Sequence, residues 1–265
     1  MTAGLAPGAR LHDALPVNGG AEVLVTNGGA DRAVFVDAGG SAEVASVATG
    51  KGPDAAAFDA HSGLVLVMDH AGGDITLIDP KSHKAVGVVA VGGELEAAAL
   101  DGAGRAFINV EDKNQIAVVD LKARRVTARY ALAGCDGPTG LAYVAAQKLL
   151  VAACDGATVV VDARTGKVLQ TLATGKGADG VAWDAGRRLA FVPAGREGTL
   201  SVISLTGRKA RIVQTLHTQV SARTIAEDPR TGRVYLPSAE LGPPATPGGR
   251  PSMVPGSFRL LVVGP

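Results

Sequence analysis

The stretch GKGPDAAAFDAHSGLVLVMDHAGGDITLIDPKSHKAVGVVAVG, Gly50 to Gly92, decides the fold of this chain. Its apolar and β-branched runs are each too short for a helix, and each ends at a turn that contains Gly, Asp, His or Lys. The stretch therefore predicts four short β-strands, at 53–59, 64–69, 74–79 and 85–91. A single sheet of this kind cannot bury both of its faces, so it needs similar sheets beside it.

An aspartate that ends the third of these strands recurs along the chain. It is found at Asp37, Asp79, Asp120 and Asp162, and Ser204 takes its place in the fifth copy, so that successive copies are 42, 41, 42 and 42 residues apart. A period of about 40 to 45 residues with four strands in each is typical of a β-propeller blade. The sequence therefore predicts an all-β fold, a β-propeller of four-stranded antiparallel blades, and we expect residues 1–265 to form a single domain.

Copies of the unit continue to the end of the chain and give about six blades. The sixth has only three strands, in ARTIAED (222–228), RVYLPS (233–238) and FRLLVV (258–263). Between the last two lies a Pro/Gly-rich loop, 239–257, which we expect to be neither strand nor helix. A propeller ring usually closes when the opposite terminus completes the last sheet. Here the donor would be residues 1–10, a poor strand, so we expect either a weakly closed ring or the absence of an N-terminal blade.

The composition limits the classes of partner. The formal net charge is +1, so no overall field draws the chain toward nucleic acid or an anionic membrane. No apolar run reaches the roughly 18 residues that span a bilayer, and residues 1–16 lack the apolar segment of a secretory signal. Aromatic residues make up only 3% of the chain, so we expect the blades to pack mainly through Val, Ile, Leu and Ala.

Several motifs have simple structural interpretations. GKGADG, residues 175–180, matches a dinucleotide-binding pattern, but that pattern needs a following helix and none is expected here. The recurring aspartates stand where the third strand turns into the fourth, and we expect them to accept backbone N–H bonds there. The histidines in or beside loops lack metal-ligand spacing, and we expect them to be solvated: His61, His70, His83 and His217.

The two cysteines belong to one repeat. Cys135 precedes the first strand of the fourth repeat and Cys154 ends its second strand. These strands run antiparallel, so the start of one lies beside the end of the other, within the Cα separation of about 4.4–6.8 Å that a disulfide needs. We predict a Cys135–Cys154 bridge, the alternative being two inert buried thiols. A bridge would favour an oxidising compartment.

The repeat units also carry a family resemblance. Their form, (L/V)xVxN…xVxVID…TGKVxxTxxxGxxPDxxAxD, resembles the YVTN-repeat, YncE-like propeller family of bacterial cell-envelope proteins, most clearly in NGGADRAVFVD (27–37) and DARTGKVLQTLATGKGADGVAWD (162–184). The resemblance implies a seven-bladed ring and a periplasmic or secreted location. We expect this sequence to depart from the family by lacking an export signal and the first blade. The family also suggests single-stranded DNA as a ligand, but the near-neutral charge and few aromatics weaken that suggestion.

A column of polar residues begins the first strand of each repeat. Aligning LHDAL, GPDAA, ELEAA, GPTGL, GADGV and SARTI makes these residues equivalent: Asp13, Asp54, Glu96, Thr139, Asp179 and Arg223. The first strand of a blade is innermost, so we expect the column to lie at the mouth of the channel. We expect the basic loop residues Lys51, Lys176 and Arg196 on the same face. The column is either a polar funnel that binds a ligand such as a divalent cation, or a hydrated channel in which Arg223 neutralises a neighbour.

These observations favour a non-enzymatic binding or scaffold module of the cell envelope, without a cofactor. Its ligand would be a protein, a peptide or a polyanion bound at the channel mouth, and we expect a monomer. The alternative is a metal-dependent, lactonase-like hydrolase with Asp13, Asp54, Glu96 or Asp179 as metal ligands and general base. A third reading, a subunit of a redox protein, lacks any haem or quinone attachment motif.

Overall fold

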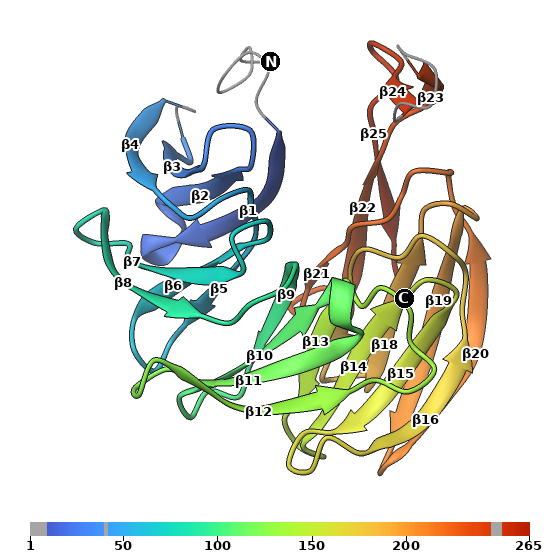
Figure 1. The fold of residues 1–265 in the computed structure, drawn as a ribbon. Helices are drawn as coiled ribbons and strands as arrows, with labels where there is room; N and C mark the ends of the chain where they lie inside the picture. The colour runs from blue at the N-terminus through green and yellow to red at the C-terminus, as the bar shows by residue number, and fades with distance from the viewer. Residues whose placement is uncertain (1–9, 40–41, 245–250) are drawn as a thin grey trace. The chain divides into compact units, whose positions relative to one another are not determined.

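A computed structural model describes residues 10–39, 42–244 and 251–265 of the chain. Within these ranges the ordered structure is almost entirely β-strand, with two single-turn 3-10 helices, η1 (Asn18–Gly20) and η2 (Glu111–Lys113) (Figure 1). The strands form six β-propeller blades. The all-β propeller fold predicted from the repeat is therefore confirmed.

The chain divides into two compact units, Met1–Ala131 and Leu132–Pro265, and the expectation of a single domain stays a prediction. The first unit holds three antiparallel sheets of four strands each, paired in chain order. Blade 1 contains β1 (Leu11–Val17), β2 (Glu22–Asn27), β3 (Arg32–Asp37) and β4 (Glu43–Ala48). Blade 2 contains β5 (Pro53–Asp59), β6 (Leu64–Asp69), β7 (Asp74–Asp79) and β8 (Lys84–Ala90). Blade 3 contains β9 (Leu95–Leu100), β10 (Arg105–Val110), β11 (Gln115–Asp120) and β12 (Arg125–Ala131).

The second unit continues the same pattern. Blade 4 contains β13 (Leu141–Val144), β14 (Leu149–Cys154), β15 (Ala157–Asp162) and β16 (Val168–Ala173). Blade 5 contains β17 (Ala182–Asp184), β18 (Leu189–Ala194), β19 (Thr199–Thr206) and β20 (Lys209–His217). Blade 6 contains β21 (Ala226–Asp228), β22 (Arg233–Ser238) and β25 (Arg259–Val263), and is three-stranded as predicted. Of residues 1–10, named above as the donor of a closing strand, residues 1–9 lie outside the described residues.

The cores lie between neighbouring blades, and β6 shows why. Successive side chains of a strand point to opposite faces. Val65 and Val67 of β6 accordingly pack with Phe35 in a core shared with blade 1. Leu66 and Met68 pack in a second core shared with blade 3. Because both faces of the middle strands are covered, these strands are continuously apolar rather than alternating.

The second unit uses the same arrangement, with one core shared by blades 4 and 5 and another by blades 5 and 6. The first strands of successive blades are in contact, β13 with β17 and β17 with β21. Just before β13 the two blades approach closely at Gly140, where an added Cβ would lie 2.5 Å from the carbonyl carbon of Gly180. Glycine is therefore required at this position by backbone packing between blades.

The variant Gly140→Ala should lower the stability of the protein by roughly 1–3 kcal/mol, since a methyl group there overlaps a neighbouring backbone. Urea unfolding followed by circular dichroism measures the change. Gly264→Ala is the control, because a Cβ at Gly264 would find its nearest atom 3.9 Å away. Equal stability of Gly140→Ala and the parent protein would refute this account of the blade contact.

The long loop of blade 6 differs from its prediction. We expected 239–257 to contain no strand, but β23 (Leu241–Pro244) pairs with β24 (Pro251–Met253) as a two-stranded ribbon. Only two residue pairs form its ladder, Leu241 with Met253 and Pro244 with Pro251. Prolines are tolerated because the ribbon is not part of a larger sheet and needs few N–H donors. Residues 245–250, at its tip, lie outside the described residues.

The predicted turns are also observed. Side-chain carboxylates at the ends of the third strands accept backbone N–H bonds: Asp79 from Lys81 (3.0 Å), Asp120 from Ala123 (2.8 Å) and Asp162 from Arg164 (2.8 Å). These aspartates are therefore structural. None of the helices among the described residues has the length and apolar character that a membrane span requires.

Candidate functional site

The polar column follows the first strands of the blades. In the first unit Asp13 lies in β1, Asp54 in β5 and Glu96 in β9, and these strands contact one another in that order. In the second unit Thr139 and Asp179 precede β13 and β17, and Arg223 precedes β21. The alignment placed Asp54 and Glu96 at equivalent positions, but in blade 1 it was one residue out of register: the pairing of β1 with β2 makes His12, not Asp13, the equivalent of Asp54.

Asp13 has a structural role. One carboxylate oxygen accepts a hydrogen bond from its neighbour Ala14 (2.8 Å), and the other accepts one from the backbone of Ala56 in blade 2 (2.9 Å). Burial raises the pKa of the Asp13 carboxyl, and the two backbone hydrogen bonds oppose that rise. Asp13 thus links the first strands of two blades, and its oxygens are already in use.

Asp54 and Glu96 each face a histidine from the preceding blade. His12 Nδ1 lies 3.3 Å from Asp54 Oδ2, and His70 Nδ1 lies 3.1 Å from Glu96 Oε1. The hydrogen bond to Glu96 is the main cause that raises the pKa of His70 to about 9, against the opposing effect of burial. His70 Nδ1 also lies 3.1 Å from the carbonyl oxygen of Leu95.

The expectation that the histidines are solvated is wrong for two of them. His70 is 27% exposed and paired with Glu96, and His83 is 24% exposed and paired with Glu22 at 2.9 Å. Both belong to turns of blade 2 that pack against a neighbouring blade, which sequence spacing does not show. His61 and His217 are exposed, as predicted.

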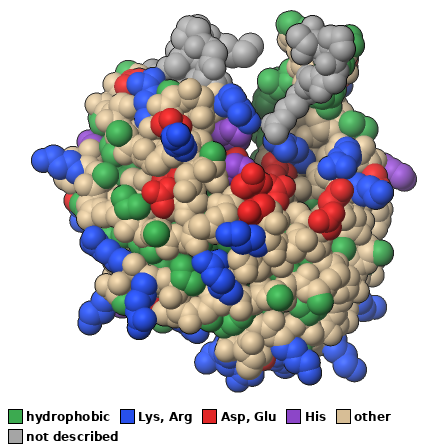
Figure 2. All heavy atoms as spheres, viewed as in Figure 1, with side chains coloured by type: hydrophobic (Ala, Val, Ile, Leu, Met, Phe, Trp, Pro, Cys, Tyr) green, Lys and Arg blue, Asp and Glu red, His purple; other side chains and the backbone are tan. Residues whose placement is uncertain are grey.

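His70 is common to two groups of possible metal ligands. In one, a ring nitrogen of His70 and single carboxylate oxygens of Asp54 and Glu96 lie within 4.8 Å of one another. The other combines His70 with Glu94 and Glu111. In Figure 2, acidic and histidine side chains lie next to one another on the face that is drawn.

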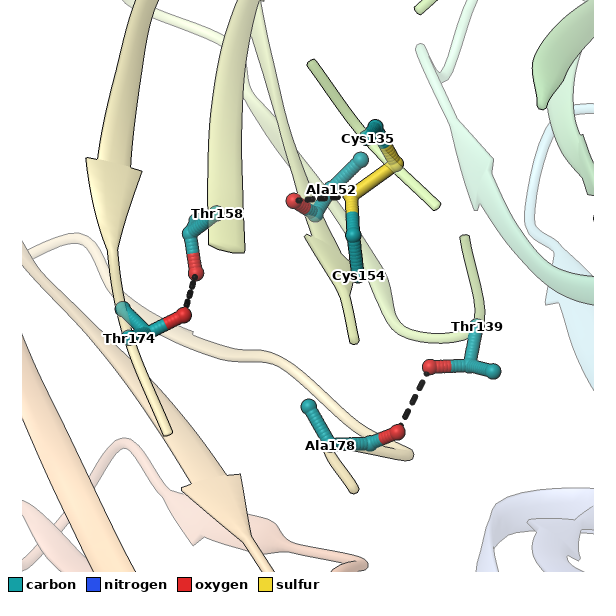
Figure 3. The surroundings of a disulfide bond; sticks show 7 residues. All are labelled: Cys135, Thr139, Ala152, Cys154, Thr158, Thr174 and Ala178. Carbon is teal, nitrogen blue, oxygen red and sulfur yellow. Dashed lines mark hydrogen bonds between the residues drawn. A yellow bond between two sulfur atoms is a disulfide. The ribbon is translucent and has the colours of Figure 1, made fainter. Parts of the chain in front are cut away.

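The second unit pairs its column differently. Arg223 Nη1 lies 3.1 Å from Asp179 Oδ2, and the Asp179 N–H donates to the Arg223 carbonyl (3.2 Å). This is the neutralising role that one of our interpretations gave to Arg223. The hydroxyl of Thr139 donates to the carbonyl of Ala178 (2.9 Å), so that Thr139 connects blades 4 and 5 (Figure 3).

The predicted basic residues occur in both units. Lys51 is an exposed residue of the loop before β5 in the first unit. In the second unit Lys176, Arg196 and Arg223 lie in adjoining loops, because the Arg196 N–H donates to the Lys176 carbonyl (3.1 Å) and Arg223 packs against Gly195. We call these three residues the basic loop cluster.

The arginines of the basic loop cluster project further than their acidic partners. Arg196 pairs with Asp155 at 3.3 Å, and the two side chains are 70% and 35% exposed. The corresponding values for Arg223 and Asp179 are 57% and 20%. The guanidinium groups therefore offer a larger exposed fraction to an approaching molecule than the carboxylates paired with them.

The predicted disulfide is present. Cys135 and Cys154 are bridged with a Cα–Cα distance of 5.4 Å (Figure 3). Both residues are buried, and the bridge joins the loop before β13 to the end of β14. The antiparallel register of these strands was sufficient to predict it.

Comparisons with known proteins support the fold and leave the family open. No protein-family model matches the chain, and no curated protein matches it in sequence. Among solved structures, a chain of the crystal structure of the mitotic checkpoint complex aligns over 88% of this chain and 73% of its own length, with a TM-score of 0.75 and 14% identity. A chain of Kuenenia stuttgartiensis hydrazine synthase aligns over 88% and 96%, with a TM-score of 0.60 and 14% identity. At this identity the likeness shows the β-propeller fold alone.

Proposed function

We propose that this protein is a binding module rather than an enzyme, a YVTN-repeat, YncE-like propeller of the cell envelope that holds a protein or peptide segment on the basic loop cluster. The observation that carries the proposal is the exposure of Arg196 and Arg223 above better buried carboxylates. Guanidinium groups bind carboxylates in a bidentate manner. An acidic side chain of the partner is therefore the group that this surface fits.

The mixed charge of the surface favours a protein over a polyanion. Asp155, Asp179 and the exposed Glu197 stand among the basic residues and would repel a continuous run of phosphates. A protein segment can place carboxylates against the arginines and its own basic groups against the aspartates. Single-stranded DNA also needs aromatic platforms for its bases, and the chain is only 3% aromatic.

An oxidising location outside the cytoplasm is part of the proposal. Disulfides persist in the periplasm and in secreted proteins and are rare in the cytosol. The buried Cys135–Cys154 bridge supports such a location. A chain of similar fold occurs in the mitotic checkpoint complex, and such a setting is compatible with a scaffold role here.

The test is charge reversal on the cluster. Binding of a fluorescein-labelled Glu-rich peptide is followed by anisotropy at several salt concentrations. Arg196→Glu with Arg223→Glu should weaken binding by at least about tenfold, because each contact between an arginine and a carboxylate becomes repulsive. Lys209→Glu with Arg211→Glu makes the same change of charge on the exposed strand β20 and should leave binding nearly unaltered.

Two results would overturn the proposal. One is equal loss of peptide affinity in the two double variants, which would reflect net charge alone. The other is tighter binding of a labelled oligothymidine than of the peptide at physiological salt. Either result would remove the basic loop cluster as a protein-binding surface.

A further inference from the structure

We propose that the first unit contains a binding site for a divalent transition metal of the zinc class, formed by His12, Asp54, His70 and Glu96. These side chains come from the first three blades: His12 from β1, Asp54 from β5, His70 from the turn after β6 and Glu96 from β9. The site is separate from the basic loop cluster and does not depend on the function proposed for it.

The distances suit a tetrahedral ion. Nitrogen and oxygen ligands bind zinc at about 2.0–2.2 Å, so two ligands of one tetrahedral ion stand about 3.4 Å apart. The two histidine–carboxylate pairs are already at 3.3 and 3.1 Å. The single ligand atoms of Asp54, His70 and Glu96 all lie within 4.8 Å of one another, and His12 joins this group through its contact with Asp54.

The four side chains are partly buried, which suits a site that exchanges its metal ion with solvent. Side-chain exposures are 20% for His12, 28% for Asp54, 27% for His70 and 13% for Glu96. The groups are thus accessible to an ion from solvent, yet restricted enough to be held in place. Gly28 contributes by leaving space for His12, since an added Cβ there would lie 3.0 Å from His12 Nε2.

The histidines are departures from the repeat, which distinguishes them from residues that every blade needs. The register of β1 places His12 where blades 2 and 3 have Asp54 and Glu96, because Leu11 pairs with Asn27 and Ala14 with Val25 just as Pro53 pairs with Asp69 and Ala56 with Val67. Carboxylates in the column alone would suit a hard cation such as calcium, which takes oxygen ligands. Two imidazoles beside two carboxylates instead suit zinc and related ions.

The experiment uses tag-free full-length protein, freed of metal with EDTA and dialysed. Calorimetric titration with zinc chloride should show one ion bound per chain, and cobalt(II) should give the visible absorption of a four-coordinate complex. Calcium chloride should give no comparable heat. Zinc should also raise the thermal unfolding midpoint, because it binds only the folded form.

Variants identify the ligands. His70→Ala and Glu96→Gln should each weaken zinc binding by at least about tenfold. Mutation of a residue that only hydrogen-bonds to a metal ligand already lowers metal affinity by that factor. The matched control is His83→Gln, which breaks the similar His83–Glu22 pair at 2.9 Å in a place with no third ligand among the described residues. It should keep the parent affinity. Circular dichroism spectra establish that each variant is folded.

Three outcomes would overturn the site. The first is no zinc binding to the parent protein at micromolar concentrations. The second is parent-like affinity in both His70→Ala and Glu96→Gln. The third is loss of binding in Glu111→Gln with retention in Glu96→Gln, which would place an ion in the other ligand group of His70.

Discussion

Removal of the Cys135–Cys154 disulfide should cost about 3 kcal/mol of unfolding free energy. The bridge closes a loop with a sequence separation of 19, and its loss returns conformational entropy to the unfolded chain. Both residues are buried, so Cys135→Ala with Cys154→Ala also removes two packed sulfur atoms. Urea unfolding at neutral pH without reductant should show the double variant to be clearly the less stable protein.

Reductant supplies the control for this prediction. Dithiothreitol should lower the urea midpoint of the parent protein toward that of the double variant and leave the double variant unchanged. Thiol titration of the unfolded parent protein should find no free thiol before reduction and two after it. If reduction leaves the parent midpoint where it was, the bridge does not stabilise the fold.

The strands of blade 2 show how much of the fold was predictable from sequence. β5, β6 and β7 have the predicted bounds, and β8 begins and ends one residue earlier than expected. The prediction worked because each strand is short and ends at a turn with Gly or Asp. The period of about 42 residues then extended the result to the other blades, and the three-stranded blade 6 followed from counting its apolar runs.

The hairpin β23–β24 was missed for a local reason. Proline content argues against strands because proline cannot donate to a ladder. The ladder of this ribbon has only two residue pairs, so it needs few backbone N–H donors and tolerates proline. Composition excluded a strand within a large sheet but not an isolated ribbon.

The candidate site was predicted only in part. Column positions follow from the repeat, so Asp54 and Glu96 were found. His70 was judged by spacing along the chain, whereas its partner Glu96 comes from the next blade. His12 was not considered, although its absence from the other five repeats is a visible signal. Contacts between blades depend on the stacking of sheets, which repeat alignment does not give at the level of side chains.

Asp69, beside that site, also departs from its counterpart in blade 1. It ends β6 as Asn27 ends β2, and it is completely buried. Its Oδ2 accepts a hydrogen bond from Thr76 (2.6 Å), but its Oδ1 is buried without a partner among the described residues. Burial raises the pKa of Asp69 to about 6, and hydrogen bonding from Thr76 only partly offsets this.

Replacing Asp69 by the residue of blade 1 should therefore stabilise the protein at neutral pH. Asp69→Asn is expected to gain at most about 3 kcal/mol at pH 8, from a pKa raised by roughly two units at 1.36 kcal/mol each. The new amide has an acceptor nearby, because Asp74 Oδ1 is also buried without a partner among the described residues. A Cβ on Gly50 would lie within 2.7 Å of both Asp74 Oδ1 and Asp69 Oδ2, so the two carboxylates are neighbours.

The pH dependence separates this mechanism from a general gain in packing. Below the ordinary aspartate pKa of 3.8, Asp69 is protonated in both the folded and unfolded chain, so Asp69→Asn should differ little from the parent. Between pH 3.8 and about 6 the unfolded chain ionises Asp69 more readily than the folded chain, so the parent loses stability and the advantage of the variant grows over this range and levels off above it. Asp79→Asn, in the same blade, is the control of opposite sign. Hydrogen bonds from Ser82 and Lys81 lower the pKa of Asp79 below its ordinary value of 3.8. Loss of the Asp79 carboxylate in Asp79→Asn should therefore destabilise the protein at pH values above 3.8. Urea midpoints of the three proteins from pH 4 to 8 decide the matter, and an Asp69→Asn advantage of constant size across the series would rule out buried ionisation as its cause.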